Sequence, residues 1–203
     1  MTLDELRSKL SYQGVLLATA ALVTSGALAL ASQLTERDIR AAADADLKQS
    51  LAQVLPGSYD NDLLRDTLAA QGPDGELTVY RARRAGRVEA VVFEVRGRGY
   101  AGPIVCMMGV DRAGRVLGVR VLKHAETPGL GDKIEPAKSD WILAFDRKFL
   151  GGPPAERWAV KKDGGVFDQF SGATITPRAV VGAVRGGLEF FAREKSRLLS
   201  DKG

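Results

Sequence analysis

The chain has 203 residues, with 29 lysines and arginines against 25 aspartates and glutamates, one histidine and one cysteine. This length accommodates a membrane anchor and one domain of roughly 150 residues with its own core. The net charge of +4 is spread along the chain, so no nucleic-acid partner is expected. A single cysteine excludes an intramolecular disulfide, an iron–sulfur cluster and a cysteine-based zinc site.

Neither of the two unique residues indicates a reactive centre. Cys106 lies in the apolar run Ile104–Met108, which is typical of a small buried hydrophobe rather than of a redox thiol. His124 has no second histidine with which to bind a metal, and no Ser–His pair is apparent. We therefore expect no metal site and no catalytic side chain.

The N-terminal segment indicates a membrane anchor. No charged residue occurs in Leu10–Thr35, which is rich in leucine, valine and alanine. A helix of about 20 such residues crosses the hydrocarbon core. A cleaved signal peptide is the alternative, because two Ala-Leu-Ala triplets resemble cleavage sites, but the apolar stretch is longer than a usual signal core and the head has no net charge. We expect a short cytoplasmic head at 1–13 and a transmembrane helix at 14–33.

Helical character continues after the anchor. In Glu36–Val54, apolar residues recur every three or four positions, which is typical of either a stalk or a helix that packs on the domain. Asn61–Ala70 is a second helical candidate. We expect a helical stalk and lead-in over 34–72 and the folded domain over 73–203.

The middle of the chain predicts a β-sheet. Leu77–Ala82 and Val88–Val95 have strand character, and Ile104–Val110 and Val116–Leu122 form a hairpin around a polar connector that contains glycine. With helices at both ends, these strands predict an α+β domain.

The last predicted helix follows a run of small residues. Thr176 and Pro177 suit the N-cap and the first position of a helix that extends to about Lys195. The small residues before them let a ligand approach the backbone, and the free N–H groups of the first helical turn favour a phosphate. From these residues alone, an ordinary tight turn is the simpler interpretation.

This run carries a family resemblance. Asp-x-x-Ser-Gly-Ala-Thr over residues 168–174 resembles the flavinylation motif of periplasmic FMN-binding domains, and its continuation Ile-Thr-Pro-Arg-Ala-Val resembles the G subunit of the Rnf (Rsx) complex. In that family a flavin transferase joins FMN through its phosphate to the threonine hydroxyl. The resemblance implies a phosphoester to Thr174, with Thr176 as the rival attachment site. The implied recognition context is Asp168, Ser171, Gly172 and Ala173.

A second segment supports the resemblance. Residues 126–131 read Glu-Thr-Pro-Gly-Leu-Gly and are similar to a loop that lies against the flavin in the same family. The implied cofactor contacts in this loop are Glu126, Thr127, Gly129 and Leu130. Trp141, Phe145 and Phe149 recur at four-residue spacing, which is typical of the core face of a helix. Trp141 is a further candidate to reach the flavin.

The resemblance implies an electron-transfer flavoprotein subunit. Such a subunit belongs to a translocase of the bacterial inner membrane that couples electron transfer between ferredoxin and NAD to ion movement, and it has little activity alone. The implied partners are the other subunits and the flavin transferase. The resemblance also places the N-terminus in the cytoplasm and the domain in the periplasm. The alternatives are the C subunit of a sodium-translocating NADH:quinone reductase and a membrane-anchored assembly module without redox chemistry.

Overall fold

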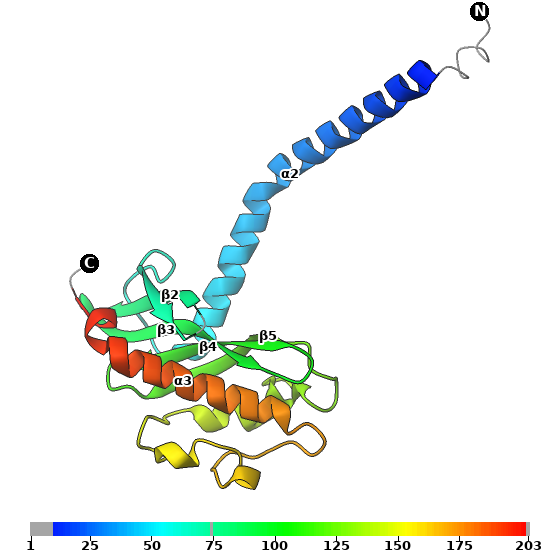
Figure 1. Ribbon diagram of the computed structural model, residues 1–203. Helices are drawn as coiled ribbons and strands as arrows, with labels where there is room; N and C mark the ends of the chain where they lie inside the picture. The colour runs from blue at the N-terminus through cyan, green and yellow to red at the C-terminus, as the bar shows by residue number, and fades with distance from the viewer. Residues whose placement is uncertain (1–9, 74, 202–203) are drawn as a thin grey trace, which may run out of the picture. The chain divides into compact units, whose positions relative to one another are not determined.

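The computed structural model describes residues 10–73 and 75–201, which form two compact units that divide after Asp46. The helices and strands of the chain are α2 (Leu10–Val54), β1 (Thr67–Gly72), β2 (Gly75–Arg84), β3 (Arg87–Arg98), β4 (Pro103–Asp111), β5 (Val116–Lys123) and α3 (Ile175–Leu198) (Figure 1). Between β5 and α3 lie the short 3-10 helices η1 (Asp132–Ile134), η2 (Asp140–Phe145), η3 (Ala155–Arg157) and η4 (Lys161–Asp163).

The N-terminal helix α2 is continuous over 45 residues. Its segment Tyr12–Val54 is long and apolar enough to cross a membrane, and the most apolar window has no buried residue. Helix formation is expected from the leucine- and alanine-rich composition, and the helix ends before Pro56-Gly57, where Gly57 has a φ of +117°. The predicted helices at 14–33 and 36–54 both lie within α2. Part of the predicted head, residues 1–9, lies outside the described residues.

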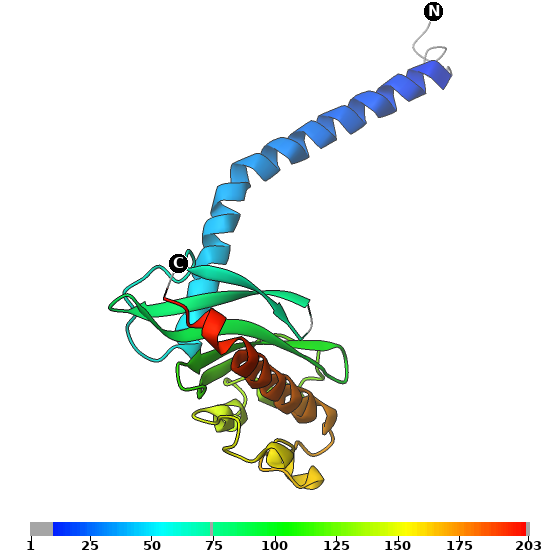
Figure 2. The same ribbon diagram turned by 60° about the vertical axis from the view of Figure 1, so that its left-hand side comes forward.

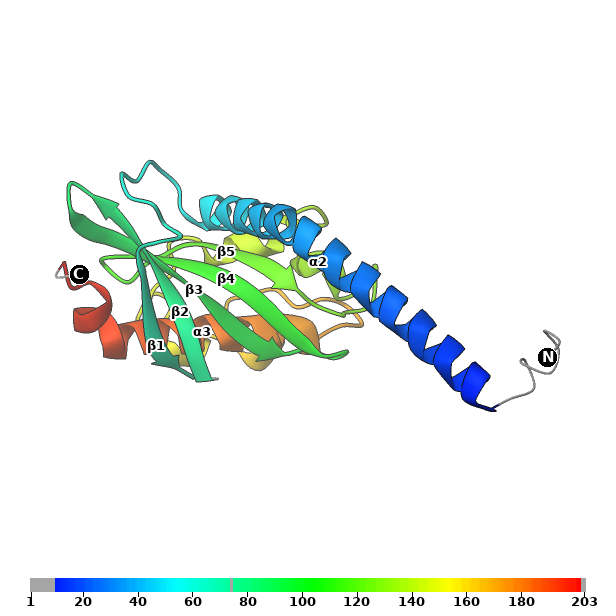
Figure 3. The same cartoon turned by 90° about the horizontal axis from the view of Figure 1, so that it is seen from above.

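The domain is built on a five-stranded antiparallel sheet in the order β1-β2-β3-β4-β5 (Figure 3). The central strands β3 and β4 are buried along most of their length because both faces of the sheet are covered. Their runs of valine, phenylalanine and methionine suit such two-sided burial. All four predicted strands are confirmed, as is the β4–β5 hairpin, in which Gly114 has a φ of +91°.

One predicted helix is wrong. The structure has turns in the first part of Asn61–Ala70 and the start of β1 in the rest. The Asn61 side chain bonds to the β2 main chain, with Nδ2 2.8 Å from Arg81 O and Oδ1 2.8 Å from Arg83 N. An asparagine that satisfies main-chain groups of a distant strand favours a turn over a helix, a competition invisible in local spacing.

The two faces of the sheet carry separate cores. On one face lies α3, as predicted for the C-terminal helix, and Phe190 of this helix meets Phe93 of β3 edge to face at 5.2 Å between ring centroids (Figures 1 and 2). On the other face, Leu51 and Val54 from the end of α2 are fully buried against β2, β3 and β4. One layer of strands with helical cover on both faces confirms the predicted α+β class.

Candidate functional site

The candidate site is formed by three segments that are distant in sequence. These are the β3–β4 turn at 99–102, the loop at 124–131 that follows β5, and the segment 168–174 that leads into α3. The long connection through the 3-10 helices returns the chain to the sheet, so the third segment meets the first two.

Helix α3 begins two residues earlier than predicted. Its first residue is Ile175 and its N-cap is Thr174, whose side chain makes no capping hydrogen bond. The prediction of Thr176 as the N-cap is therefore wrong, and Pro177 is the third helical residue instead of the first. Proline is tolerated there because main-chain N–H groups of the first turn have no partner within the helix.

A buried hydrogen-bond network explains the different start. The Thr176 hydroxyl is fully buried and donates to Oε2 of Glu126, which is itself only 5% exposed. Oε1 of Glu126 accepts a hydrogen bond from Ala101 N–H at 3.0 Å. One carboxylate thus connects the β3–β4 turn, the loop after β5 and the first turn of α3. Because it is buried with both oxygens bonded, these bonds are strong.

The loop after β5 is held from its other side as well. The Glu126 N–H donates to His124 Nδ1 at 3.1 Å, and His124 Nε2 lies 2.6 Å from Glu135 Oε1. Because Nδ1 accepts a hydrogen bond, the proton of a neutral imidazole is on Nε2, which donates to Glu135. His124 is therefore a structural member of the loop.

Two glycines allow these segments to approach one another. Gly131 ends the loop that the family resemblance indicates, whereas Gly99 is not among the predicted site residues. A Cβ at Gly131 would lie 2.8 Å from Glu126 Cβ and 2.9 Å from Thr176 Oγ1. A Cβ at Gly99 would clash with the Glu126 carboxylate and lie 2.8 Å from Ile104 Cδ1. The available signal was the glycine-rich stretch between two predicted strands, which is typical of close backbone approach.

The segment before α3 is held by Trp141. The indole Nε1–H donates to Asp168 O at 2.7 Å, and the ring packs edge to face on Phe145 and Phe170 at centroid distances of 5.4 and 5.1 Å. Trp141 therefore contacts the predicted site through the main chain of Asp168. Phe149, predicted to share a helix face with Trp141, lies beyond η2 and is 42% exposed.

Thr174 itself is partly exposed at the N-terminus of a 24-residue helix. The chain reaches it through Ser171 and Gly172, both exposed, and Gly172 adopts a left-handed φ of +80°. Apart from its chain neighbours, a Cβ at Gly172 would have one atom of the described residues within 4 Å, Leu130 Cδ2 at 3.7 Å. Leu130 is 43% exposed and Ile175 is 44% exposed, so apolar surface flanks the threonine.

Two ion pairs surround this turn. Lys161 Nζ lies 2.5 Å from Asp168 Oδ1, and Arg178, one helical turn after Thr174, forms a two-pronged pair with Asp163 at 2.6 and 2.7 Å. The hydrogen bonds from Arg178 lower the pKa of Asp163 below its usual value. Both cations are paired with carboxylates, so the positive end of the α3 dipole is the feature here that suits an anionic ligand.

The structure thus brings most of the predicted residues together. Glu126 and Thr176 are bonded, Leu130 lies beside Gly172, and Trp141 holds Asp168. Thr127 and Gly129 lie exposed on the same loop, where Thr127 O accepts the N–H groups of Leu130 and Gly131. Among the described residues there is no cluster of three or more potential metal ligands.

The fold and this site define an FMN-binding domain on a long apolar helix, and residues 99–189 match the family model described as "FMN-binding domain". The chain is 50% identical over 192 residues to the G subunit of the ion-translocating oxidoreductase complex of Stutzerimonas stutzeri, covering 94% of this chain and 84% of that protein. It is 51% identical over 189 residues to the corresponding protein of Cereibacter sphaeroides (strain ATCC 17029 / ATH 2.4.9), covering 92% and 86%.

The chain therefore belongs to the family of G subunits of ion-translocating oxidoreductase complexes, which confirms the predicted family. A solved structure, NqrC of Shewanella oneidensis, is 24% identical, covers 73% of this chain and 72% of that chain, and has a TM-score of 0.48.

Proposed function

We propose that this protein is an electron-transfer subunit of a membrane-bound, ion-translocating oxidoreductase complex and carries FMN as a phosphoester on Thr174. The observation that supports the attachment point is the contrast between two nearby hydroxyls. Thr174 is partly exposed and makes no capping hydrogen bond, whereas Thr176 is fully buried and bonded to Glu126. A modifying enzyme reaches the first hydroxyl and not the second.

The residues around Thr174 fit a flavin phosphate. The first-turn N–H groups of α3 and its dipole stabilise a phosphoester at the N-cap, and the exposed Gly172 leaves room beside it. The exposed side chains of Leu130 and Ile175 offer apolar surface for an aromatic ring system. Trp141 and Glu126 hold the two supporting segments in place, as their hydrogen bonds to Asp168 O and to the Thr176 hydroxyl indicate.

Attachment requires an activated flavin donor and a transferase. In a pyrophosphate-linked donor, the Thr174 oxygen forms a new bond to the phosphorus of the FMN half. The bond from that phosphorus to the bridging oxygen breaks, and the other nucleotide leaves with this oxygen and, through the transferase or solvent, the hydroxyl proton. FMN supplies the redox chemistry, and the protein supplies its position and electrostatic environment. No side chain acts as a nucleophile or general base in electron transfer, so the isolated chain has little activity.

The relatives are named as subunits of an ion-translocating oxidoreductase complex, and this supports the role in a larger assembly. We place residues 14–33 of α2 across the bacterial inner membrane, with residues 1–13 in the cytoplasm and the domain in the periplasm. There the tethered flavin relays electrons between neighbouring subunits, and the complex couples electron transfer between ferredoxin and NAD to ion movement.

In-gel flavin fluorescence of the full chain, produced together with a flavin transferase, tests the attachment. We expect a fluorescent band for the wild type and for Thr176→Ser, and none for Thr174→Ala and Thr174→Val. Mass spectrometry of the peptide that contains Thr174 locates the phosphoester. A fluorescent Thr174→Ala band, or an unmodified wild-type peptide, would contradict the proposal and favour a structural turn in an assembly module.

A further inference from the structure

The ladder between β2 and β3 opens before either strand ends. Pairing of these strands extends only as far as Tyr80↔Val92. Beyond this point, among the described residues, β2 extends to Gly75 paired with β1 alone, and β3 extends to Arg98 paired with β4 alone. Two strand edges therefore face each other within the sheet, and Figure 3 shows the strands diverging over α3.

The facing edges leave main-chain groups without partners. No hydrogen bond joins 75–79 to 93–97 among the described residues. Unpaired N–H and C=O groups along a strand are the usual template for pairing with a further strand. Here two such edges border a single gap, which is unusual because edges normally occur at the outside of a sheet.

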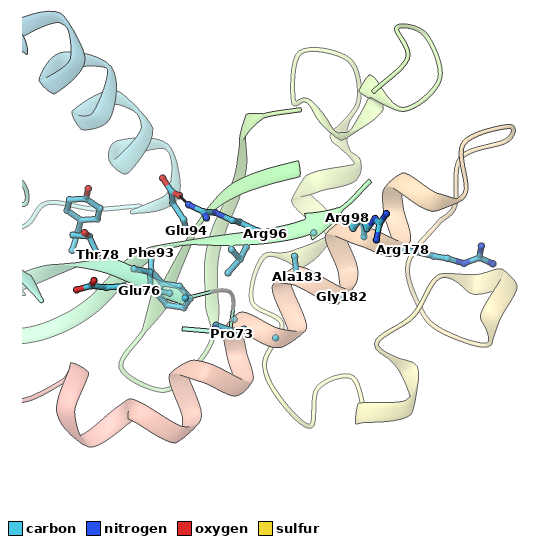
Figure 4. Close-up of a pocket in the computed structure, with 18 residues that line it drawn as sticks. Pro73, Glu76, Thr78, Phe93, Glu94, Arg96, Arg98, Arg178, Gly182 and Ala183 are labelled. Atoms are coloured by element: carbon cyan, nitrogen blue, oxygen red, sulfur yellow. Dashed lines mark hydrogen bonds and ion pairs between the residues drawn. The ribbon is translucent and has the colours of Figure 1, made fainter. Parts of the chain in front are cut away.

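The gap opens into a cavity of about 530 Å³ between β2, β3 and α3 (Figure 4). Small residues of α3 form its floor, including Ala179, Gly182, Ala183 and Gly186. Apart from the neighbouring backbone of α3 itself, no atom of the described residues would lie within 4 Å of a Cβ at Gly182 or Gly186, so this part of the helix faces open space. The volume is of the size that binding sites use, and the walls are main chain and short side chains.

The cavity carries complementary charges on its two sides. Glu76 lies on the β2 side and Arg98 on the β3 side, and neither forms an ion pair in the part of the chain that the structure describes (Figure 4). By contrast, Arg96 is paired with Glu94 at 3.2 Å. An occupant with a carboxylate near Arg98 and a basic group near Glu76 matches this arrangement.

We propose that the gap between β2 and β3 is a docking site for an extended segment of another polypeptide, which adds a strand between the two edges. An extended backbone supplies N–H and C=O groups at the spacing of both edges. The segment carries small or aliphatic side chains toward α3, an acidic residue for Arg98 and a basic residue for Glu76. In the proposed complex this segment belongs to a neighbouring subunit. The strand edges that pair with it do not include the attachment residue Thr174, although Arg178 lines this cavity as well as flanking the attachment site.

Hydrogen exchange tests the docking. The full chain is compared alone in detergent and within the complex purified from membranes, and the amides of 75–79 and 93–97 are followed. We expect exchange about 100-fold slower in the complex, because strand pairing protects amides until the local structure opens. Equal exchange in both samples would overturn the proposal. If amides of the isolated chain become protected as the protein concentration rises, the gap binds a second copy of the chain. If they become protected on addition of lipid, the gap binds lipid. Either result would overturn docking of a neighbouring subunit.

A groove-filling variant tests the same site independently. Gly182→Leu places a side chain in the open space of the cavity, whereas Ala192→Leu places the same side chain on an exposed position of α3 outside it. We expect Gly182→Leu to remove the protection and to reduce recovery of the subunit in the complex about tenfold or more. Ala192→Leu is expected to behave as the wild type. Both variants should keep their flavin fluorescence, and neither should lower the melting temperature.

The charge reversal Arg98→Glu provides a second test of the site if Gly182→Leu lowers the melting temperature. Arg98→Glu changes an exposed side chain that makes no ion pair among the described residues, so folding is not at risk. We expect weaker incorporation into the complex, partly restored at high salt because repulsion is screened. Normal incorporation and unchanged protection in Arg98→Glu and Gly182→Leu would overturn the proposal.

Discussion

Two threonines separated by one residue have opposite surroundings, and this difference explains how a single hydroxyl can be selected. Thr174 and Thr176 have the same chemistry, but only Thr176 is fully buried. Its hydroxyl is bonded to Glu126, whereas Thr174 makes no capping bond. In the proposed function, selection by the transferase therefore rests on accessibility in the folded domain.

The hydrogen bond between Glu126 and Thr176 is expected to stabilise the folded domain. Glu126→Gln replaces the charge-assisted bond to the Thr176 hydroxyl by a weaker amide–hydroxyl bond, and Thr176→Val leaves Glu126 Oε2 buried without its donor. Each is therefore expected to lower the free energy of unfolding by about 1–3 kcal/mol. Chemical denaturation of the full chain in detergent, followed by tryptophan fluorescence, measures the loss.

The double variant provides the control for this prediction. Because both changes remove the same interaction, the double variant is expected to lose clearly less than the sum of the two single losses. Strictly additive losses would show that the two side chains do not stabilise the domain through each other.

At the scale of elements, α3 uses its glycines in two different ways. Gly187 lies against the sheet, where a Cβ would be 2.6 Å from both Val95 Cγ1 and Met108 Cε. Gly182 faces the open cavity and has no such neighbour. The first glycine allows close packing of helix on sheet, and the second keeps the cavity open.

Substitution by alanine is expected to separate these uses. Gly187→Ala should lower the free energy of unfolding by about 1–3 kcal/mol, because β-branched Val95 has little freedom to move and the core is overpacked. Gly182→Ala should raise it by about 0.5–1 kcal/mol through helix propensity alone. Thermal and chemical denaturation of the two variants provide the comparison. A stabilised Gly187→Ala would mean that the core repacks without cost.

The pattern of apolar residues along the chain predicted most of the helices and strands correctly. The apolar stretch of α2, the strand character of β2 and β3 and the start signal before α3 each predict an element that the structure contains, because each pattern reflects local geometry and burial. The helix predicted for Asn61–Ala70 was wrong because the Asn61 side chain bonds to main-chain groups 20 and 22 residues away. Such a competitor has no signature in local spacing.

At the scale of the whole molecule, the lone cysteine offers a way to test topology. Cys106 is buried, and burial raises the pKa of its thiol to about 12, so the thiolate needed for alkylation is scarce at neutral pH. The native chain is therefore expected to react poorly with maleimides, while Ser196→Cys introduces an exposed thiol on α3.

Labelling of intact cells with a membrane-impermeant maleimide then reports the side on which the domain lies. We expect Ser196→Cys to be labelled in intact cells and the wild type to remain unlabelled before and after lysis. Labelling of Ser196→Cys only after lysis would place the domain in the cytoplasm and contradict the proposed orientation.

By itself, the sequence determined the features that depend on neighbouring residues: an apolar helix of membrane-spanning length, the strands of the sheet, and the motif that ends in Thr174. Only the tertiary structure decided that Thr174 rather than Thr176 occupies the N-cap position of α3, since the hydrogen bond that holds Thr176 joins it to Glu126, 50 positions away. The opening between β2 and β3 is likewise invisible in the sequence, because both strands have regular patterns throughout and pairing is a property of two segments together.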